Sequence, residues 1–150
     1  MSTSDRTISI TGYSDDIVTI KGAGVHEEID CYDRPVTLAF SSGETYQASY
    51  TNNGTSTHNG GTINFASTTG TQTLTGAMGT SSPLGSVVFY GGAAKTFSAA
   101  ASTTNFTISS GSGVVTAPST ALSIRGNYTN NSTFTHNSGT VILDGTSQQT

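Results

Sequence analysis

Two histidines occupy matching positions of a repeated block, and histidine is the side chain best suited to acid–base chemistry near neutral pH. His58 and His136 lie in residues 50–62 and 128–140, which are identical at ten of thirteen positions at an offset of 78. Neither histidine has Cys, Asp or Glu within metal-ligand spacing. A repeat copies structural positions together with their strand, whereas a catalytic residue is not normally duplicated in this way. We therefore interpret both histidines as structural, capping a turn or stacking between coils.

A second candidate is the segment 26–31, which holds His26, two glutamates, Asp30 and Cys31. On a helical turn His26 and Asp30 would share one face, and together they would suit a transition metal. A structural zinc site usually needs four ligands at recognised spacings, and the sequence has no second cluster. A solvated acidic turn is the preferred interpretation. Because Cys31 would need a basic partner to act as a nucleophile, we expect it to be a partly buried small side chain.

Two further patterns offer oxygen ligands or hydroxyl groups. Asp15 and Asp16 are candidate Ca²⁺ ligands, but the Gly-Gly-x-Gly-x-Asp repeat of calcium-binding β-rolls is absent. Threonines two residues apart can form flat ladders that order water, which makes an ice-binding face one hypothesis and chance pairing in a Thr-rich chain the other. These pairs are Thr55/Thr57, Thr71/Thr73, Thr73/Thr75 and Thr133/Thr135. We assign no catalytic, cofactor-binding or metal-binding residue.

Charge is concentrated in the first third of the chain. Eight of the nine acidic residues lie in residues 1–50, and residues 51–150 hold only three charged side chains: Lys95, Arg125 and Asp144. Polysaccharide hydrolysis needs a pair of carboxylates, so the second region is not expected to catalyse it. Clusters of Lys and Arg that neutralise phosphates are missing too, which argues against nucleic acid and anionic membranes as partners. We predict a protein that is not an enzyme.

The composition changes near residue 50. Thr, Ser, Gly and Asn account for 60 of residues 51–150. We therefore predict an N-terminal β cap over 1–49 and a β-repeat region over 50–150, with repeat copies 50–127 and 128–150, the second cut off in mid-repeat. Cys31 is the only cysteine, so no disulfide forms within one chain. The N-terminus lacks the regions of a signal peptide, and no apolar run has the length of a membrane-spanning helix.

Short strands are expected to follow one another about every ten residues of the repeat region. Their apolar centres are Phe65, Leu74, Val88, Phe97, Ile108, Val115, Ile124, Phe134 and Ile142. Polar β-formers flank each centre and Gly-rich turns separate them. One or two large apolar residues per strand are too few for a sandwich core, whereas stacked Thr, Ser and Asn can form ladders. The sequence predicts an all-β fold with a right-handed parallel β-solenoid; a β-sandwich is the alternative.

The first fifty residues are expected to cover the first coil of this solenoid. Strands are predicted over Thr7–Ile10 and Ile17–Ile20. A hairpin is predicted from Val36–Phe40 and Thr45–Tyr50, and a short helical turn over Val25–Asp33.

The block from Tyr128 to Val141 resembles a repeat of large bacterial surface and adhesin-like proteins, as do the stretches Lys95–Ser98 and Ala121–Asn127. The resemblance covers about residues 50–150 and implies parallel β-helices outside the cell. Residues 8–50 resemble small uncharacterised bacterial and prophage-encoded proteins. That second resemblance is carried by Gly12–Asp16, Cys31–Asp33, Pro35-Val36 and Ser42-Gly43, and it implies no known activity.

Together these observations predict a structural or adhesive extracellular β-repeat module that self-assembles end to end into filaments. A fibre or spike component of a phage virion is one alternative, and an ice- or carbohydrate-binding solenoid is another. The expected partners are further copies of the chain, joined through the solenoid ends, and a surface glycan. The expected location is extracellular or on the cell surface, with the virion as the alternative.

Overall fold

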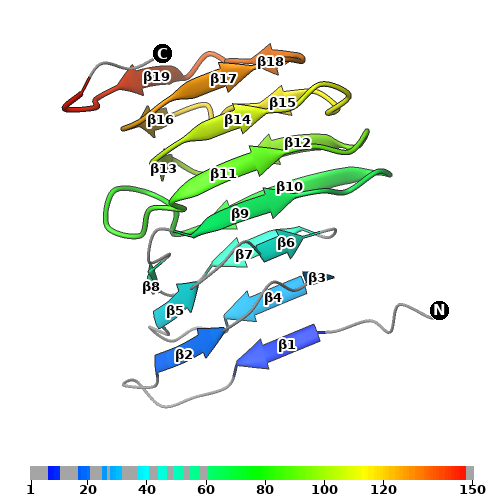
Figure 1. Cartoon of the computed structure of the whole chain (residues 1–150), viewed down its shortest axis with the longest axis vertical. Helices are drawn as coiled ribbons and strands as arrows, with labels where there is room; N and C mark the ends of the chain where they lie inside the picture. The colour runs from blue at the N-terminus through cyan, green and yellow to red at the C-terminus, as the bar shows by residue number, and fades with distance from the viewer. Residues whose placement is uncertain are drawn as a thin grey trace.

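The computed structural model describes residues 7–10, 17–20, 25–26, 28–31, 37–40, 44–46, 49–52, 55–57 and 61–147, with side chains for 49–52 and 61–147. Every described element is a β-strand, and the strands stack in coils along the long axis of the molecule (Figure 1). All strand pairs are parallel and join one coil to the next. The all-β parallel solenoid expected from the sequence is therefore confirmed.

Each coil contributes strands to as many as three sides. The first sheet contains β1 (Thr7–Ile10), β4 (Glu28–Cys31), β7 (Tyr50–Asn52), β10 (Thr71–Gly76), β12 (Ala94–Phe97), β15 (Val115–Thr116) and β18 (Phe134–Thr135). The second sheet contains β3 (Val25–His26), β6 (Glu44–Tyr46), β9 (Thr62–Phe65), β11 (Ser86–Phe89), β14 (Phe106–Ile108) and β17 (Tyr128–Asn130). The third side, called the middle side here, is formed by strands that follow a strand of the first sheet along the chain. It consists of two three-stranded sheets, the middle sheets. One contains β2 (Ile17–Ile20), β5 (Thr37–Phe40) and β8 (Thr55–Thr57), and the other contains β13 (Ala101–Thr103), β16 (Ala121–Ile124) and β19 (Thr140–Leu143).

The length of a coil follows from the strand register. Thr7 pairs with Glu28, Tyr50 with Leu74 and Thr37 with Thr55, so one coil takes between 18 and 24 residues. A spacing of about ten residues between strand centres, as expected from the sequence, leaves room for two or three short strands in such a coil. The predicted boundary at residue 50 falls between β6 and β7, inside the stack of coils.

The strands predicted at Thr7–Ile10 and Ile17–Ile20 are confirmed, but two other local predictions for the first fifty residues were wrong. The predicted hairpin is absent, because β5 and β6 lie in different sheets and pair with strands of neighbouring coils. The predicted helical turn is replaced by β3 and β4. A parallel partner one coil away supplies the hydrogen bonds of these strands, and turn residues in the sequence carry no sign of that partner.

The core is a narrow column in which aromatic rings follow one another from coil to coil. Along the second sheet the ring of Phe65 stacks on Phe89 at 5.2 Å, Phe89 meets Phe106 at 5.2 Å, and Phe106 meets Tyr128 at 5.8 Å. Buried Leu, Ile and Val side chains from all sides fill the remaining space. Inward residues alternate with outward ones along the strands, as in β9 and β11. One or two large apolar residues per strand suffice because a solenoid has only this thin interior.

One coil departs from the pattern on the middle side. After β10 the chain forms only an isolated bridge, between Met78 and Ala101, and then a loop that leads to β11. This loop is hydrogen-bonded to the next coil: the N–H of Leu84 donates to the carbonyl of Ser102 at 2.9 Å. The N–H of Thr104 donates to the carbonyl of Gly85 at 2.7 Å. The backbone in and beside β13 is thus hydrogen-bonded to the previous coil, although β13 is the first strand of its sheet.

Candidate functional site

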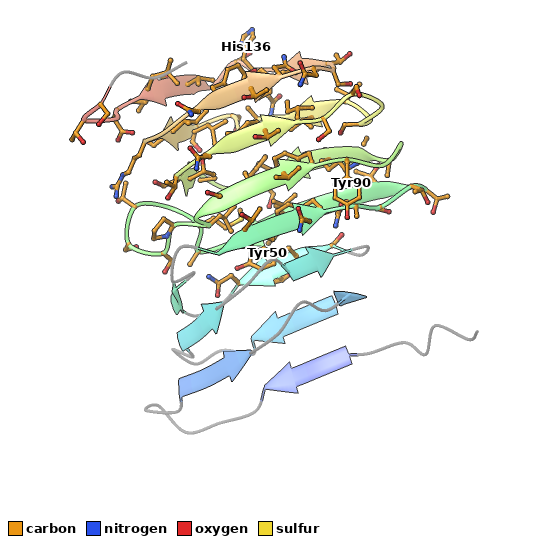
Figure 2. All side chains as sticks on the ribbon, viewed as in Figure 1. Tyr50, Tyr90 and His136 are labelled. Atoms are coloured by element: carbon orange, nitrogen blue, oxygen red, sulfur yellow. The ribbon has the colours of Figure 1, made fainter. Side chains whose placement is uncertain are left out.

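His136 lies in a tight turn at the C-terminal end of the molecule (Figure 2). The turn follows β18, and Asn137 and Ser138 have φ angles of 51° and 58°. The Nδ1 atom of the exposed His136 ring accepts a hydrogen bond from the N–H of Ser138 at 3.1 Å, and the His136 carbonyl accepts one from Gly139 at 2.9 Å. His136 therefore caps a turn, in agreement with the structural interpretation. Its repeat counterpart His58 lies outside the described residues.

The structure separates the segment His26–Cys31 into two strands. His26 lies on β3 in the second sheet, whereas Asp30 and Cys31 lie on β4 in the first. The shared helical face that would have brought His26 and Asp30 together does not exist. Asp15 and Asp16 lie outside the described residues. Within the described part of the chain, no three His, Cys, Asp or Glu residues come together as a metal site.

Threonines form a column across the outer face of the first sheet. Thr73, Thr96, Thr116 and Thr135 are in register on four successive strands, at half-buried or exposed positions. Ser49 continues the column, since its hydroxyl accepts a hydrogen bond from the N–H of Thr73 at 3.0 Å. Three of the threonine pairs noted in the sequence, Thr71/Thr73, Thr73/Thr75 and Thr133/Thr135, contribute to this face, whereas Thr55/Thr57 lies on β8 in another sheet.

The remaining positions of this face are small or apolar. Thr75 and Ser98 share a hydrogen bond of 2.7 Å between their hydroxyl groups in a second column. Ala94 and Val114 interrupt a third column that begins with Thr71. The outward positions of β10, β12, β15 and β18 include no charged residue. The result is an uncharged array of hydroxyl and methyl groups.

The outer face of the second sheet has a different polar ladder. Asn105, directly before β14, lies between Ser86 on β11 and Asn127, directly before β17. Its Nδ2 donates to the hydroxyl of Ser86 at 2.9 Å, and its Oδ1 accepts from the N–H of Asn127 at 2.9 Å. The Asn105 side chain thus links three coils, through a side-chain hydroxyl on one side and a backbone N–H on the other.

The last coil exposes an apolar edge. Strands β17, β18 and β19 are each the final member of their sheet, so on one side their backbones have no partner strand in the described structure. Val141, Ile142 and Leu143 on β19 are 37%, 40% and 57% exposed. Tyr128 and Phe134 are only partly buried against the core. Unpaired backbone edges beside apolar side chains are the usual features of a strand-pairing surface.

Lys95 is the feature that the sequence reasoning missed. It is fully buried on β12, and its Nζ donates to the carbonyl oxygens of Tyr90, Gly91 and Ala93 at 2.6, 2.6 and 2.8 Å. The carbonyl oxygen of Ser67 lies 3.4 Å from the same atom. Burial lowers the pKa of Lys95 from 10.5 to about 8. The available signal was the alternation of β12, in which Lys95 stands two residues before Phe97 and so shares its inward face.

Comparisons with protein-family models, with curated proteins and with solved structures found no match to this chain. Among the described residues no helix is long and apolar enough to cross a membrane.

Proposed function

We propose that the chain is a non-enzymatic structural or adhesive module, acting outside the cell, whose copies stack end to end into filaments. The observation that carries this proposal is the open edge of the last coil with its exposed apolar residues Val141, Ile142 and Leu143. The resemblance of the repeat region to bacterial surface proteins supports the extracellular location.

The order of the strands supports stacking of a second copy in one direction. The first sheet ends at β1 and β18, and the second sheet ends at β3 and β17. On the middle side β2 and β19 are the outermost strands. The first coil of one copy can therefore continue all three sides of the last coil of another, by parallel strand addition. Such an arrangement is heterologous and does not close, so it produces filaments.

The side chains of the last coil supply a driving force. Stacking removes the apolar surface of Val141, Ile142 and Leu143 from water, which stabilises the contact by roughly 25 cal/mol for each Å² buried. The described residues near this edge carry little charge that would have to be desolvated: Asp144 follows β19 and is exposed. An enzymatic role has little support, because Asp144 is also the only acidic residue in 61–147.

The experiment compares two lysine substitutions at equally exposed apolar positions. Ile142→Lys places a charge on the last coil, whereas Val114→Lys places one on the side of the solenoid; the two residues are 40% and 41% exposed. We expect negative-stain microscopy to show filaments for the wild-type chain and for Val114→Lys, and separate particles for Ile142→Lys. A wild-type chain that stays monomeric at all concentrations would contradict the proposal.

A second candidate function, ice binding, is favoured by the threonine columns of the first sheet. Neighbouring strands are about 4.8 Å apart and same-face residues about 6.6 Å apart along a strand, so the hydroxyls form a two-dimensional array comparable to the oxygen repeats of an ice surface. Thermal hysteresis tests this function. We expect Thr96→Lys to abolish it and Thr107→Lys, on the outer face of the second sheet, to leave it intact. No hysteresis in the wild-type chain would exclude this function.

A further inference from the structure

The turn between β11 and β12 gathers carbonyl oxygens around a single point inside the solenoid. Three of them, from Tyr90, Gly91 and Ala93, belong to this turn, and the fourth, from Ser67, belongs to the turn one coil earlier. The Nζ of Lys95 occupies the point where they converge. An ammonium group has three N–H donors, and the three shortest contacts, at 2.6 to 2.8 Å, match them.

Among the residues whose side chains are described, 49–52 and 61–147, the charge at this point has no anionic partner. Lys95, Arg125 and Asp144 are the only charged residues in 61–147, and Asp144 is exposed directly after β19. The inward neighbours of Lys95 in the first sheet are Gln72 and Val115, neither of which is charged. In the described part of the chain, the ammonium group contacts backbone carbonyls. Buried charges are usually paired or metal-bound, so this arrangement is a specialised cation environment.

The carbonyl cage is held by backbone contacts that do not involve the Lys95 side chain. The N–H of Ala93 donates to the carbonyl of Ser67 at 3.1 Å, and the N–H of Gly113 donates to that of Gly91 at 3.0 Å. The turn is therefore hydrogen-bonded to the coil before it and to the coil after it.

Gly91 permits this close stacking. Its φ is +75°, and a Cβ atom at this position would lie 2.5 Å from the carbonyl oxygens of Ala66 and Ser67. Only glycine adopts this conformation at so small a distance from a neighbouring backbone. Because these backbone hydrogen bonds do not involve the Lys95 side chain, we expect the oxygens to keep their positions when that side chain is shortened.

We propose that this turn is a monovalent-cation site that the chain fills with its own Lys95 ammonium group. Backbone carbonyls that converge on one point are the ligands that replace the hydration shell of K⁺ in proteins, and ammonium makes the same contacts as hydrogen bonds. The tethered cation joins two successive coils through Ser67 on one side and Tyr90, Gly91 and Ala93 on the other. A chain with a shortened side chain at position 95 leaves this site open to a free ammonium or potassium ion.

The test uses the full chain with Lys95→Ala, and Lys95→Met as the matched control whose long side chain still fills the site. Thermal unfolding is followed in ammonium, potassium and tetramethylammonium chloride at equal ionic strength. We expect the Tm of Lys95→Ala to rise with ammonium or potassium concentration relative to tetramethylammonium, because an ion that binds only the folded state stabilises it. Equal Tm values in the three salts, or the same rise in Lys95→Met, would overturn the proposal.

A measurement on the wild-type chain covers the case in which Lys95→Ala does not fold. In ¹⁵N NMR spectra at neutral pH, we expect the Lys95 side chain to have the shift of an ammonium group and slowly exchanging protons. These signals persist under conditions in which exposed lysine ammonium protons exchange with water. A neutral-amine shift, or exchange as fast as that of an exposed lysine, would show that no bound cation occupies the cage.

Discussion

The two copies of the repeated block, residues 50–65 and 128–143, have closely similar sequences and lie on different sides of the solenoid. The first copy supplies β7 to the first sheet, β8 to a middle sheet and β9 to the second sheet. The second copy supplies β17 to the second sheet, β18 to the first and β19 to the other middle sheet. Every strand of the second copy is therefore displaced by one side relative to its counterpart (Figure 1).

The displacement follows from the number of residues in each coil. Successive coils of the first sheet from Tyr50 onward take 24, 23, 20 and 19 residues, so three coils span 67 residues and four span 86. The offset of 78 between the two copies lies between these values. The block thus encodes three short strands and the turns between them, and the chain that precedes it decides which sheets they join. Burial differs as well: Tyr50 is fully buried between coils, whereas Tyr128 is only partly buried in the last coil.

The largest expected effect is the difference in stability between alanine variants of these two tyrosines. Tyr50→Ala should destabilise the chain by about 3–5 kcal/mol, since it removes a fully buried ring that packs against Phe65. Tyr128→Ala should cost clearly less, because the Tyr128 ring is only partly buried. Urea unfolding of both variants measures the difference. Equal losses would mean that the two copies occupy equivalent positions.

Because the ammonium group of Lys95 is buried, the stability of the folded chain should depend on pH. The folded chain releases the Lys95 proton near the lowered pKa of about 8, whereas the unfolded chain keeps it up to about 10.5. Between these values the unfolded state binds more protons, so stability rises with pH. The gain has an upper bound of about 3 kcal/mol.

The matched variant for this pH effect is Lys95→Met, because all other titrating groups are common to both chains. The difference in unfolding free energy between wild type and Lys95→Met should move in favour of the wild type from below pH 8 to above pH 10.5. A flat difference, or one of opposite sign, would show that the carbonyl oxygens around the Lys95 ammonium group fully compensate for its burial.

A smaller effect compares the asparagines that follow the two tyrosines. Asn52 is buried and its Nδ2 donates to the carbonyl of Ala77 at 2.7 Å. Asn130 is exposed, and its Oδ1 accepts from the N–H of Ser132 at 3.1 Å. We expect Asn52→Ala to cost about 0.5–1.5 kcal/mol, because it removes the hydrogen bond between the buried Asn52 side chain and the Ala77 carbonyl. Asn130→Ala should stay within about 0.5 kcal/mol in the same urea titration.

Several strands and the polar ladders could be predicted from residues alone. Alternation of apolar and polar side chains placed strands at Ile17–Ile20 and around Phe65 and Phe97, and all are present. The prediction failed where it relied on turn residues between Val25 and Tyr50. There the choice between hairpin, helical turn and parallel coil depends on partners about twenty residues away, which local sequence does not specify.

Some features of the candidate sites could likewise be predicted from the sequence, and others could not. The repeat context of His136 left two structural roles open, capping a turn or stacking between coils, and its ring accepts a hydrogen bond within a turn. The threonine pairs were visible in the sequence, but only the strand register brings Thr73, Thr96, Thr116 and Thr135 into one column. The carbonyl cage around Lys95 could not be predicted, since its oxygens come from turns of two coils and backbone groups leave no sign in side-chain patterns.

The sequence by itself determined that this chain forms short β-strands around a thin core, because periodic apolar residues and Gly-rich turns are local properties. The tertiary structure alone decided which side each strand occupies, which tyrosine of the repeated pair is covered, and what surrounds Lys95. These features depend on the number of residues in each coil. A change of a few residues in coil length moves the following strand to another position, while its own sequence remains the same.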